Sequence, residues 1–383
     1  MKTPPDDIDS EASAHAWRRQ FLKQLAAMVA GTSALSACGG HADEPPSGKA
    51  PAPAPAPAGG ANLKLSGTVA HRSVVTITDS LARFGTRTNV KPLYVAFGDQ
   101  RAGSALGRRT GDYYNIGALA SNAKTVGAIT QTYRYDFKGT ETENAIWGNE
   151  IFFTEDATRP LLQYMERYYD FDIYQAKYQK GGQFNLKTNR LWGNWNINPS
   201  VCDLYVGYNG SWGPMGAVAA EHTPESPSWM DNTDVPAFQW MSEEYVFQNS
   251  SAPDRPDGFM EFYRNNKLQN TVRTQFITHT SANPLPLTMV FFDQVSNGSG
   301  DGVSNIFEYL GYINLDDEYR RVYLSDSPTR APGSKLIPMI QTAWSPASLS
   351  IQLVNSQLPF SGNYLHIRLG KDTWLEAIPM PAA

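Results

Sequence analysis

The sequence predicts an all-β protein whose main body is an antiparallel sandwich of two sheets. Apolar and polar residues alternate with period two in many short segments. β-Branched and aromatic residues fill these segments, and little of the chain shows the helical period of 3.6. Because short strands recur along most of the chain, a two-sheet sandwich accounts for the pattern with the fewest assumptions.

Composition excludes several classes of protein. The chain has 383 residues, a net charge of −5, 18% charged and 12% aromatic residues. So few charges among so many aromatic residues argue against a disordered chain. A slightly acidic protein lacks the basic face that nucleic acids require, so we expect no nucleic-acid partner. Two cysteines exclude a disulfide framework and a four-thiolate zinc site.

The first 37 residues have the features of an export signal. Arg18-Arg19-Gln20-Phe21-Leu22-Lys23 precedes an apolar stretch that is shorter than the about 20 residues of a membrane-spanning helix. The arginine pair resembles a twin-arginine (Tat) signal, although Trp17 replaces the usual Ser or Thr. Leu35-Ser36-Ala37-Cys38 resembles a lipobox, which implies lipidation of Cys38. The alternative is a plain secretory signal with an incidental cysteine.

The lipobox resemblance also implies a location. Gly39 follows the cysteine, a pattern similar to that of lipoproteins anchored to the outer membrane or cell surface of Gram-negative bacteria. Residues 38–62 contain an Ala-Pro repeat, which favours the extended polyproline II conformation. We therefore expect a membrane partner through the lipid anchor, and a semi-rigid stalk that holds the folded part above the membrane.

The folded part begins with two strands. Residues 63–69 alternate, and residues 73–78 are mostly β-branched. The segment 63–98 resembles the first strands of an IPT/TIG-like immunoglobulin-type module; the alternative is that these are edge strands of the sandwich that follows. The role of residues 99–150 stays open.

The range 99–328 is predicted to form the sandwich. Asn265-Asn266 is typical of a two-residue hairpin turn. Together with the Asp257-Gly258 strand start, the stretch 244–268 resembles concanavalin-like jelly-roll domains of the laminin-G and polysaccharide-lyase kind. That resemblance implies a jelly-roll sandwich. Residues 329–383, with alternation at 341–345, 349–353 and 364–369, are predicted to form a C-terminal β appendage.

A concentration of tryptophans suggests a sugar-binding face. Five of the nine tryptophans lie between residues 187 and 240, among Asn, Gly and Ser. Aromatic rings stack on the apolar face of a pyranose, while amides and cations bind its hydroxyls. The alternative, that the rings fill the core, has equal weight. The candidate carbohydrate-binding residues are Lys187, Trp192, Asn194, Trp195, Trp212, Trp229 and Gln248.

A polysaccharide lyase needs a cation that neutralises a uronate carboxylate and a base that removes the adjacent proton. Arg190 is the candidate cation, and His222 or Tyr263 is the candidate base. A glycosidase needs two facing carboxylates. No strand motif supplies them, and we expect Glu243-Glu244 to be a solvated strand start.

We expect no cofactor. Asp293 and Asp301 lie in or near a Gly/Asn/Ser-rich segment that has the oxygen donors for a structural calcium ion. The favoured alternative is a plain loop without metal. Cys202, in a strand, is expected to be a buried inert thiol.

These patterns lead to one functional expectation and two alternatives. The leading hypothesis is an envelope-anchored protein that recognises a polysaccharide through the face formed by residues 187–264. The first alternative is a polysaccharide lyase that acts on a uronate-containing polymer. The second is a structural or adhesion surface protein without a small ligand.

Overall fold

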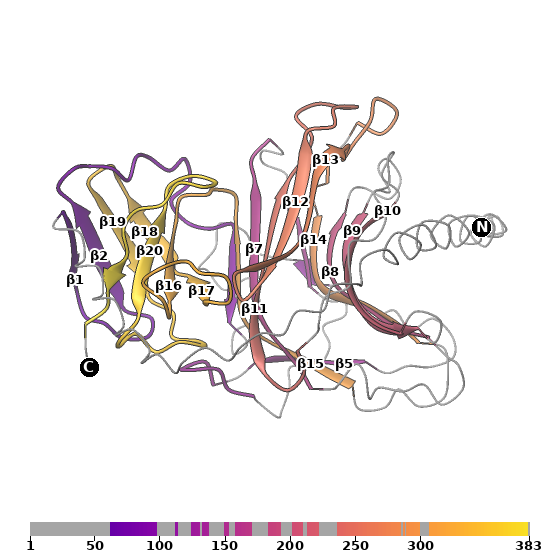
Figure 1. The fold of residues 1–383 in the computed structure, drawn as a ribbon, viewed down its shortest axis with the longest axis horizontal. Coiled ribbons are helices and arrows are strands. Elements are labelled where there is room, and N and C mark those ends of the chain that lie inside the picture. The colour runs from indigo at the N-terminus through magenta and orange to yellow at the C-terminus, as the bar shows by residue number, and fades with distance from the viewer. Residues whose placement is uncertain are drawn as a thin grey trace, which may run out of the picture. The chain divides into compact units, whose positions relative to one another are not determined.

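The computed structural model describes residues 62–97, 112–113, 124–130, 132–137, 149–152, 158–170, 183–192, 201–209, 213–221, 236–284, 286–287, 289–298 and 306–381. These residues form strands and no helix, and all strand-to-strand pairings are antiparallel (Figure 1). The predicted fold class, an all-β antiparallel sandwich of the jelly-roll type with smaller β flanks, is confirmed. None of the described residues form a helix that could cross a membrane. The signal, Cys38 and the stalk up to residue 61 lie outside the described residues.

The largest sheet has seven strands. Its order is β13-β12-β11-β7-β15-β3, and β5 also pairs with β15. Asn265 and Asn266 connect β12 to β13 with φ values of 45° and 53°, in the left-handed region that Asn tolerates, so the predicted hairpin turn is confirmed. The strands are β3 (Tyr94–Phe97), β5 (Tyr133–Phe137), β7 (Leu161–Tyr169), β11 (Trp240–Gln248), β12 (Gly258–Arg264), β13 (Lys267–Phe276) and β15 (Ile306–Asp316).

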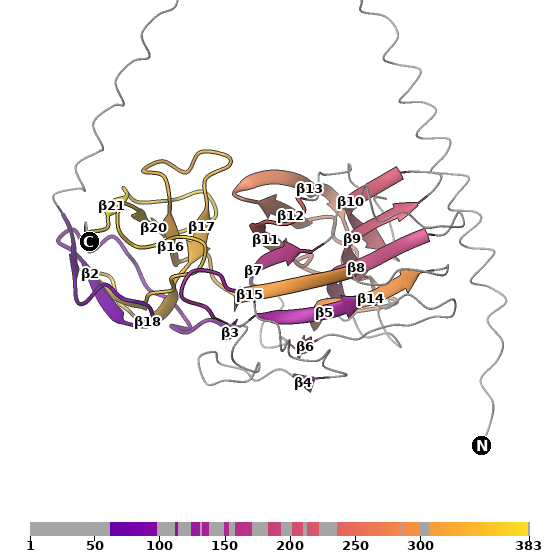
Figure 2. The ribbon, with the colours of Figure 1, turned by 90° about the horizontal axis from the view of Figure 1, so that it is seen from below.

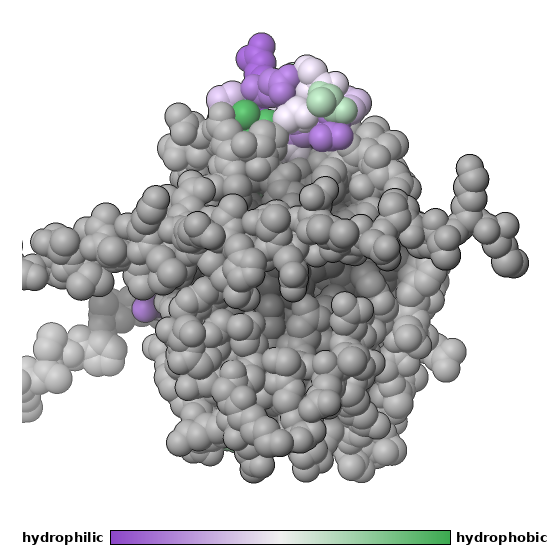
Figure 3. Space-filling view, turned by 90° about the vertical axis from the view of Figure 1, so that its right-hand side faces the viewer, coloured by the Kyte–Doolittle hydropathy of each residue, from purple (hydrophilic) through white to green (hydrophobic). Residues whose placement is uncertain are grey.

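A six-stranded sheet lies beside it (Figures 1 and 2). Its order is β10-β9-β8-β14-β6-β4. The loops from β11 to β12 and from β13 to β14, at the top of Figure 1, present mainly hydrophilic residues at the top of Figure 3. The six strands are β4 (Asp112–Tyr113), β6 (Asn149–Phe152), β8 (Gln183–Trp192), β9 (Val201–Asn209), β10 (Gly213–Glu221) and β14 (Met289–Gly298).

Two four-stranded sheets, in the orders β1-β2-β19-β18 and β17-β16-β20-β21, form what we call the small sandwich. Because β2 pairs with β19, the segments 63–98 and 329–383 share one sheet. Strand β16 lies within the range expected for the main sandwich, but it pairs with β17 and β20. The division of the chain into domains stays a prediction. The strands are β1 (Leu63–Ser66), β2 (Val74–Asp79), β16 (Arg321–Ser325), β17 (Leu336–Pro338), β18 (Ile340–Trp344), β19 (Ser348–Gln352), β20 (Tyr364–Arg368) and β21 (Ile378–Pro379).

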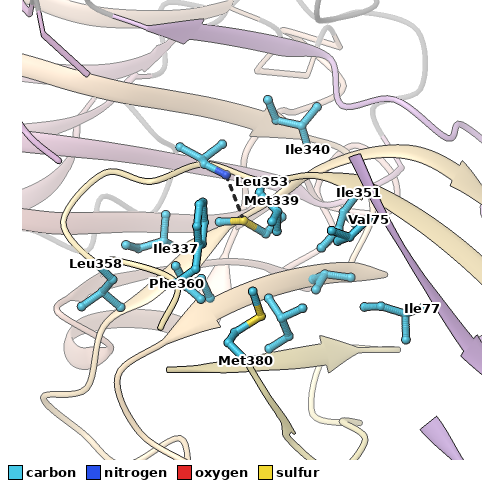
Figure 4. Close-up of a cluster of buried hydrophobic side chains, with 14 of the residues drawn as sticks. Val75, Ile77, Ile337, Met339, Ile340, Ile351, Leu353, Leu358, Phe360 and Met380 are labelled. Atoms are coloured by element: carbon cyan, nitrogen blue, oxygen red, sulfur yellow. Dashed lines mark hydrogen bonds between the residues drawn. The ribbon is translucent and has the colours of Figure 1, made fainter. Parts of the chain in front are cut away.

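Alternate residues of these strands form the core of the small sandwich (Figure 4). Val75 and Ile77 of β2 and Ile351 of β19 are fully buried against Ile337 of β17. Met339 Sδ accepts a hydrogen bond of 3.3 Å from the backbone N–H of Val354, drawn as the dashed line in Figure 4. Burial of these side chains stabilises the fold by about 1.5–3 kcal/mol each.

The small sandwich is joined to the seven-stranded sheet by buried polar contacts. Arg321 of β16 donates from Nη1 to Glu244 Oε1 at 3.0 Å and from Nη2 to Asn314 Oδ1 at 2.6 Å. Arg87 Nη2 contacts both carboxylate oxygens of Asp316 at 2.9 and 3.0 Å. These contacts fix the geometry of the junction between the two parts, where the candidate site lies.

Candidate ligand-binding site

A pocket of about 530 Å³ opens where three segments distant in sequence meet at this junction. The segments come from residues 125–127, from the start of β11 and from residues 335–359 around β17 to β19. We call it the Trp240 pocket. Its walls consist of Thr125, Val126, Gly127, Gln239, Trp240, Lys335, Asn355, Ser356, Gln357 and Pro359.

Local contacts fix the aromatic wall. Trp240 is the first residue of β11, and its Nε1 donates to the carbonyl of Thr125 at 3.1 Å. The ring of Tyr168, on the neighbouring strand β7, meets the Trp240 ring edge-on with centroids 5.5 Å apart. The indole is therefore held in one orientation, which is what a stacking platform requires.

A tight turn at Gly127 holds the segment 125–127 against the segment 335–359. Gly127 has a φ of 56°, and a Cβ there would overlap the carbonyl oxygen of Ser356. Only glycine accepts both the left-handed backbone and this close approach. Ala128 N–H donates to Asn355 O at 3.0 Å, which ties the two walls together.

A carboxyl group lies directly behind the pocket wall. Glu166 of β7 is completely buried, and its Oε1 accepts from Gln357 N at 3.4 Å, Gln357 Nε2 at 3.3 Å and Tyr164 Oη at 3.3 Å. Its Oε2 has no hydrogen-bond partner among the described residues. Burial raises the pKa of Glu166 to about 7, and the hydrogen bonds from Gln357 and Tyr164 oppose that rise only in part.

The pocket wall is polar but carries little charge. Its one charged side chain is Lys335, and three amides line it, from Gln239, Asn355 and Gln357. Gln357 Oε1 is buried without a hydrogen-bond partner in the described part of the chain. Within that part, no group of three His, Cys, Asp or Glu residues could hold a metal ion. The wall is suited to binding a polar ring-shaped ligand.

A second polar cluster lies deeper in the seven-stranded sheet. Arg167 Nε contacts Glu243 Oε2 at 2.8 Å, Arg264 Nη2 contacts Glu243 Oε1 at 2.9 Å, and Arg167 also pairs with Glu308. Arg167, Glu243 and Glu308 are fully buried. The prediction of a solvated strand start at Glu243-Glu244 is therefore wrong for Glu243. Strand β11 starts at Trp240, so this residue lies inside the strand, where the two arginines compensate its charge.

Two of the predicted site residues have described side chains. Tyr263 Oη donates to Glu261 at 2.8 Å, and burial raises the pKa of Tyr263 to about 12, so the phenol is protonated at neutral pH. Gln248 Nε2 donates to the carbonyl of Thr158. Tyr263 lies opposite Glu244, and Gln248 lies opposite Phe259, so the two are separated along the sheet. Neither residue lines the Trp240 pocket.

The other predicted residues stay predictions. Lys187, Arg190 and Trp192 lie on β8, opposite Tyr205, Asp203 and Val201 of β9, and the structure describes their backbone only. The same holds for Asp293 on β14 and Cys202 on β9. Asn194, Trp195, Trp212, His222, Trp229 and Asp301 lie outside the described residues.

Sequence reasoning missed the Trp240 pocket because its walls lie mostly outside the 187–264 range. Trp240 belonged to the tryptophan-rich stretch but was not chosen as a site residue. The sequence contained one signal of the pocket, a glycine inside a strand, which often marks a place where another part of the chain approaches the backbone closely. At Gly311 of β15, a Cβ would lie 2.8 Å from Val126 Cγ1 and 3.2 Å from Glu166 Oε2.

Comparisons with known proteins give similarity in structure only. No protein-family model matches the chain, and no curated protein matches it in sequence. An alginate lyase from Chlorella virus, vAL-1, is 10% identical, with 67% of this chain and 94% of that chain covered and a TM-score of 0.29. The receptor-binding domain of botulinum neurotoxin D is 9% identical, with coverages of 73% and 72% and a TM-score of 0.37. The lectin UEA-II, complexed with galactose, is 10% identical, with coverages of 49% and 86% and a TM-score of 0.29. Similarity at this level carries no argument about the function of this chain.

Proposed function

We propose that this protein recognises a polysaccharide and that the Trp240 pocket holds one of its sugar units. The observation that carries the proposal is the combination, in one pocket of about 530 Å³, of a fixed indole ring with three amide side chains. The indole face provides the apolar platform for a pyranose ring, and the amides provide donors and acceptors for its hydroxyls.

An unpaired buried acceptor supports the same reading. Gln357 Oε1 has no hydrogen-bond partner among the described residues, although its amide lines the pocket. An unsatisfied buried polar atom costs about 1–3 kcal/mol. Because this oxygen is buried, a sugar hydroxyl donates to it and removes that cost only when the Gln357 amide turns toward the ligand.

Simple recognition is favoured over lyase chemistry at this site. No residue that lines the Trp240 pocket has a phenol or an imidazole that could act as a base. Among the lyase candidates, Tyr263 has a protonated phenol committed to Glu261. The lyase alternative therefore depends on Arg190 and His222. We also propose, from the sequence pattern alone, that export and lipidation at Cys38 anchor the protein to the cell envelope.

Calorimetric titration of the full chain with laminarin, alginate and polygalacturonate tests the proposal. We expect at least one of these polymers to bind, and Trp240→Ala to weaken that binding about tenfold or more. Phe238→Ala is the matched control, because Phe238 is 56% exposed, lies two residues away and does not line the pocket. This variant should bind within about twofold of the wild type.

Two results would overturn the proposal. One is the absence of binding to all three polymers. The other is unchanged binding by Trp240→Ala. A rise in absorbance at 235 nm during incubation, from an unsaturated uronate product, would instead establish the lyase alternative. Near-ultraviolet circular dichroism of each variant shows whether it has kept the native packing.

A further inference from the structure

Glu166 is hydrogen-bonded to a residue that lines the Trp240 pocket. Gln357, which lines the pocket, donates two hydrogen bonds to Glu166 Oε1 from its backbone N and its Nε2. The Glu166 Oε2 atom, Val126 Cγ1 and Trp240 Cζ3 all lie within 3.4 Å of one point, the position that a Cβ on Gly311 would occupy. Residues from two walls of the pocket and this carboxyl group therefore meet around Gly311 of β15.

Among the described residues, none forms an ion pair that would provide Glu166 with a countercharge. From its own strand, the neutral phenol of Tyr164 faces it, and from β15 the phenol of Tyr312 does so. The charge of Glu244 on β11 raises the pKa of Tyr164, and Glu244 is itself paired with Arg321. Ser356 and Gln357 face it from the pocket wall, and Lys335 is the one cation that lines the pocket. None of the ion pairs described includes Glu166.

Three donors converge on one oxygen of this carboxyl, and the other oxygen accepts no hydrogen bond from the described residues. Tyr164 Oη, Gln357 N and Gln357 Nε2 donate to Oε1, whereas Oε2 has no partner in the described part of the chain. A carboxylate distributes its charge over both oxygens, so this arrangement suits a carboxylic acid, with the proton on Oε2, better than a carboxylate.

We infer that occupation of the Trp240 pocket is coupled to proton uptake by Glu166, so that the protein binds its ligand with this side chain in the neutral form. The inference depends on the proposed function of the pocket. A sugar unit seated on Trp240 and Gln357 displaces solvent from the pocket that Gln357 lines. Removal of that solvent lowers the polarity around the buried Glu166 and further disfavours the charged carboxylate. By reciprocity, protonation of Glu166 must then strengthen ligand binding.

The direction of the pH effect on affinity, and the pH range in which it occurs, follow from the burial of Glu166. Because burial already raises the pKa of Glu166 to about 7, the empty pocket changes protonation state near neutral pH. Ligand binding raises that pKa further, so affinity should increase as the pH falls through this range. A further rise of one pKa unit corresponds to about a tenfold gain in affinity at acid pH compared with alkaline pH.

Calorimetry at pH 7 in phosphate and in Tris measures the coupling, because the two buffers differ in ionisation enthalpy. We use the full chain with laminarin, which is neutral, and with alginate, whose carboxylates stay ionised between pH 5.5 and 8.5. The expected result for the wild type is uptake of a fraction of a proton per site, with affinity highest at pH 5.5. Glu166→Gln mimics the neutral acid and should bind without proton uptake, with an affinity that no longer depends on pH.

Glu376→Gln is the matched control. Glu376 pairs with Arg83 at 2.7 Å and does not line the pocket, so this variant should keep the pH dependence of the wild type. Binding by the wild type with no proton uptake, or with proton release, overturns the coupling and leaves the proposed function intact. Absence of binding to laminarin, alginate and polygalacturonate at every pH overturns both the coupling and the proposed function. The buffer comparison needs no variant, so the inference is tested even if Glu166→Gln fails to fold.

Discussion

Replacement of Glu166 by Gln should stabilise the folded protein at pH 8 and have a much smaller effect on its stability at pH 5. The side chain is completely buried, and burial raises its pKa from 4.5 to about 7. Since the folded state holds this proton more tightly than the unfolded state, the stability of the wild type falls as the pH rises from 4.5 to 7.

The size of the effect follows from the same shift. A change from 4.5 to about 7 corresponds to about 3 kcal/mol in the free energy of unfolding. The amide of Gln stays neutral at every pH, and its carbonyl oxygen can still accept from Gln357 and Tyr164. Glu166→Gln should therefore gain up to about 3 kcal/mol over the wild type at pH 8, and about 1 kcal/mol or less at pH 5.

Guanidinium denaturation at pH 5, 6.5 and 8 measures these differences. Glu376→Gln provides a control of opposite sign, because hydrogen bonds from Arg83 lower the pKa of Glu376. That variant should lose nearly the same stability at pH 5 and pH 8, because this carboxyl takes up its proton below pH 4.5 in the folded protein. If Glu166→Gln differs from the wild type by the same amount at pH 5 and pH 8, Glu166 does not titrate in this range and the reasoning from burial is refuted.

Three further substitutions test other parts of the structure. Arg167→Met removes one of the two arginine partners of the buried Glu243, so chemical denaturation should show a loss of about 3–5 kcal/mol in the free energy of unfolding. A loss below about 1 kcal/mol would contradict the buried ion cluster. Ile351→Ala opens a cavity in the small sandwich and should cost about 2–5 kcal/mol in thermal unfolding, whereas an unchanged melting temperature would show that the core is not packed as described. Gly127→Ala forces two walls of the pocket apart and should weaken the binding of laminarin or alginate. Gly333→Ala is the control: its Cβ meets open space at a φ of 93°, so it should cost about 1–2 kcal/mol of strain and leave binding intact. Equal losses of binding in the two variants would rule out a specific role for the Gly127 turn.

The strands could be predicted because strand formation depends on local pattern. Val75 and Ile77 alternate with polar residues, and the structure buries both of them in β2. Asn265 and Asn266 form the expected turn because Asn tolerates a positive φ. In such cases neighbouring residues contain all the information that the prediction needs.

The candidate site could not be predicted in this way. Trp240 and Gln357 are brought together by strand pairing between distant parts of the chain, and no spacing in the sequence reports that pairing. Nor does the sequence show that Glu166 is charged or neutral, since its pKa depends on burial under residues that are far away in the chain. Glu243 was misjudged for the same reason, because its compensating arginines lie on other strands.

The pairing of β2 with β19 has a consequence for the order in which the protein is made. Thr76 and Ser350 are 274 residues apart in the chain, yet their hydroxyl groups are hydrogen-bonded at 3.0 Å. At about 5–20 residues per second, a ribosome needs roughly 14–55 seconds between these two residues. During that time β1 and β2 have only each other as neighbours in their sheet, and the edge of β2 that later pairs with β19 is open to wrong partners. The small sandwich can close only late in synthesis, so any chain that stops before Ser348 leaves these first strands without their native neighbour.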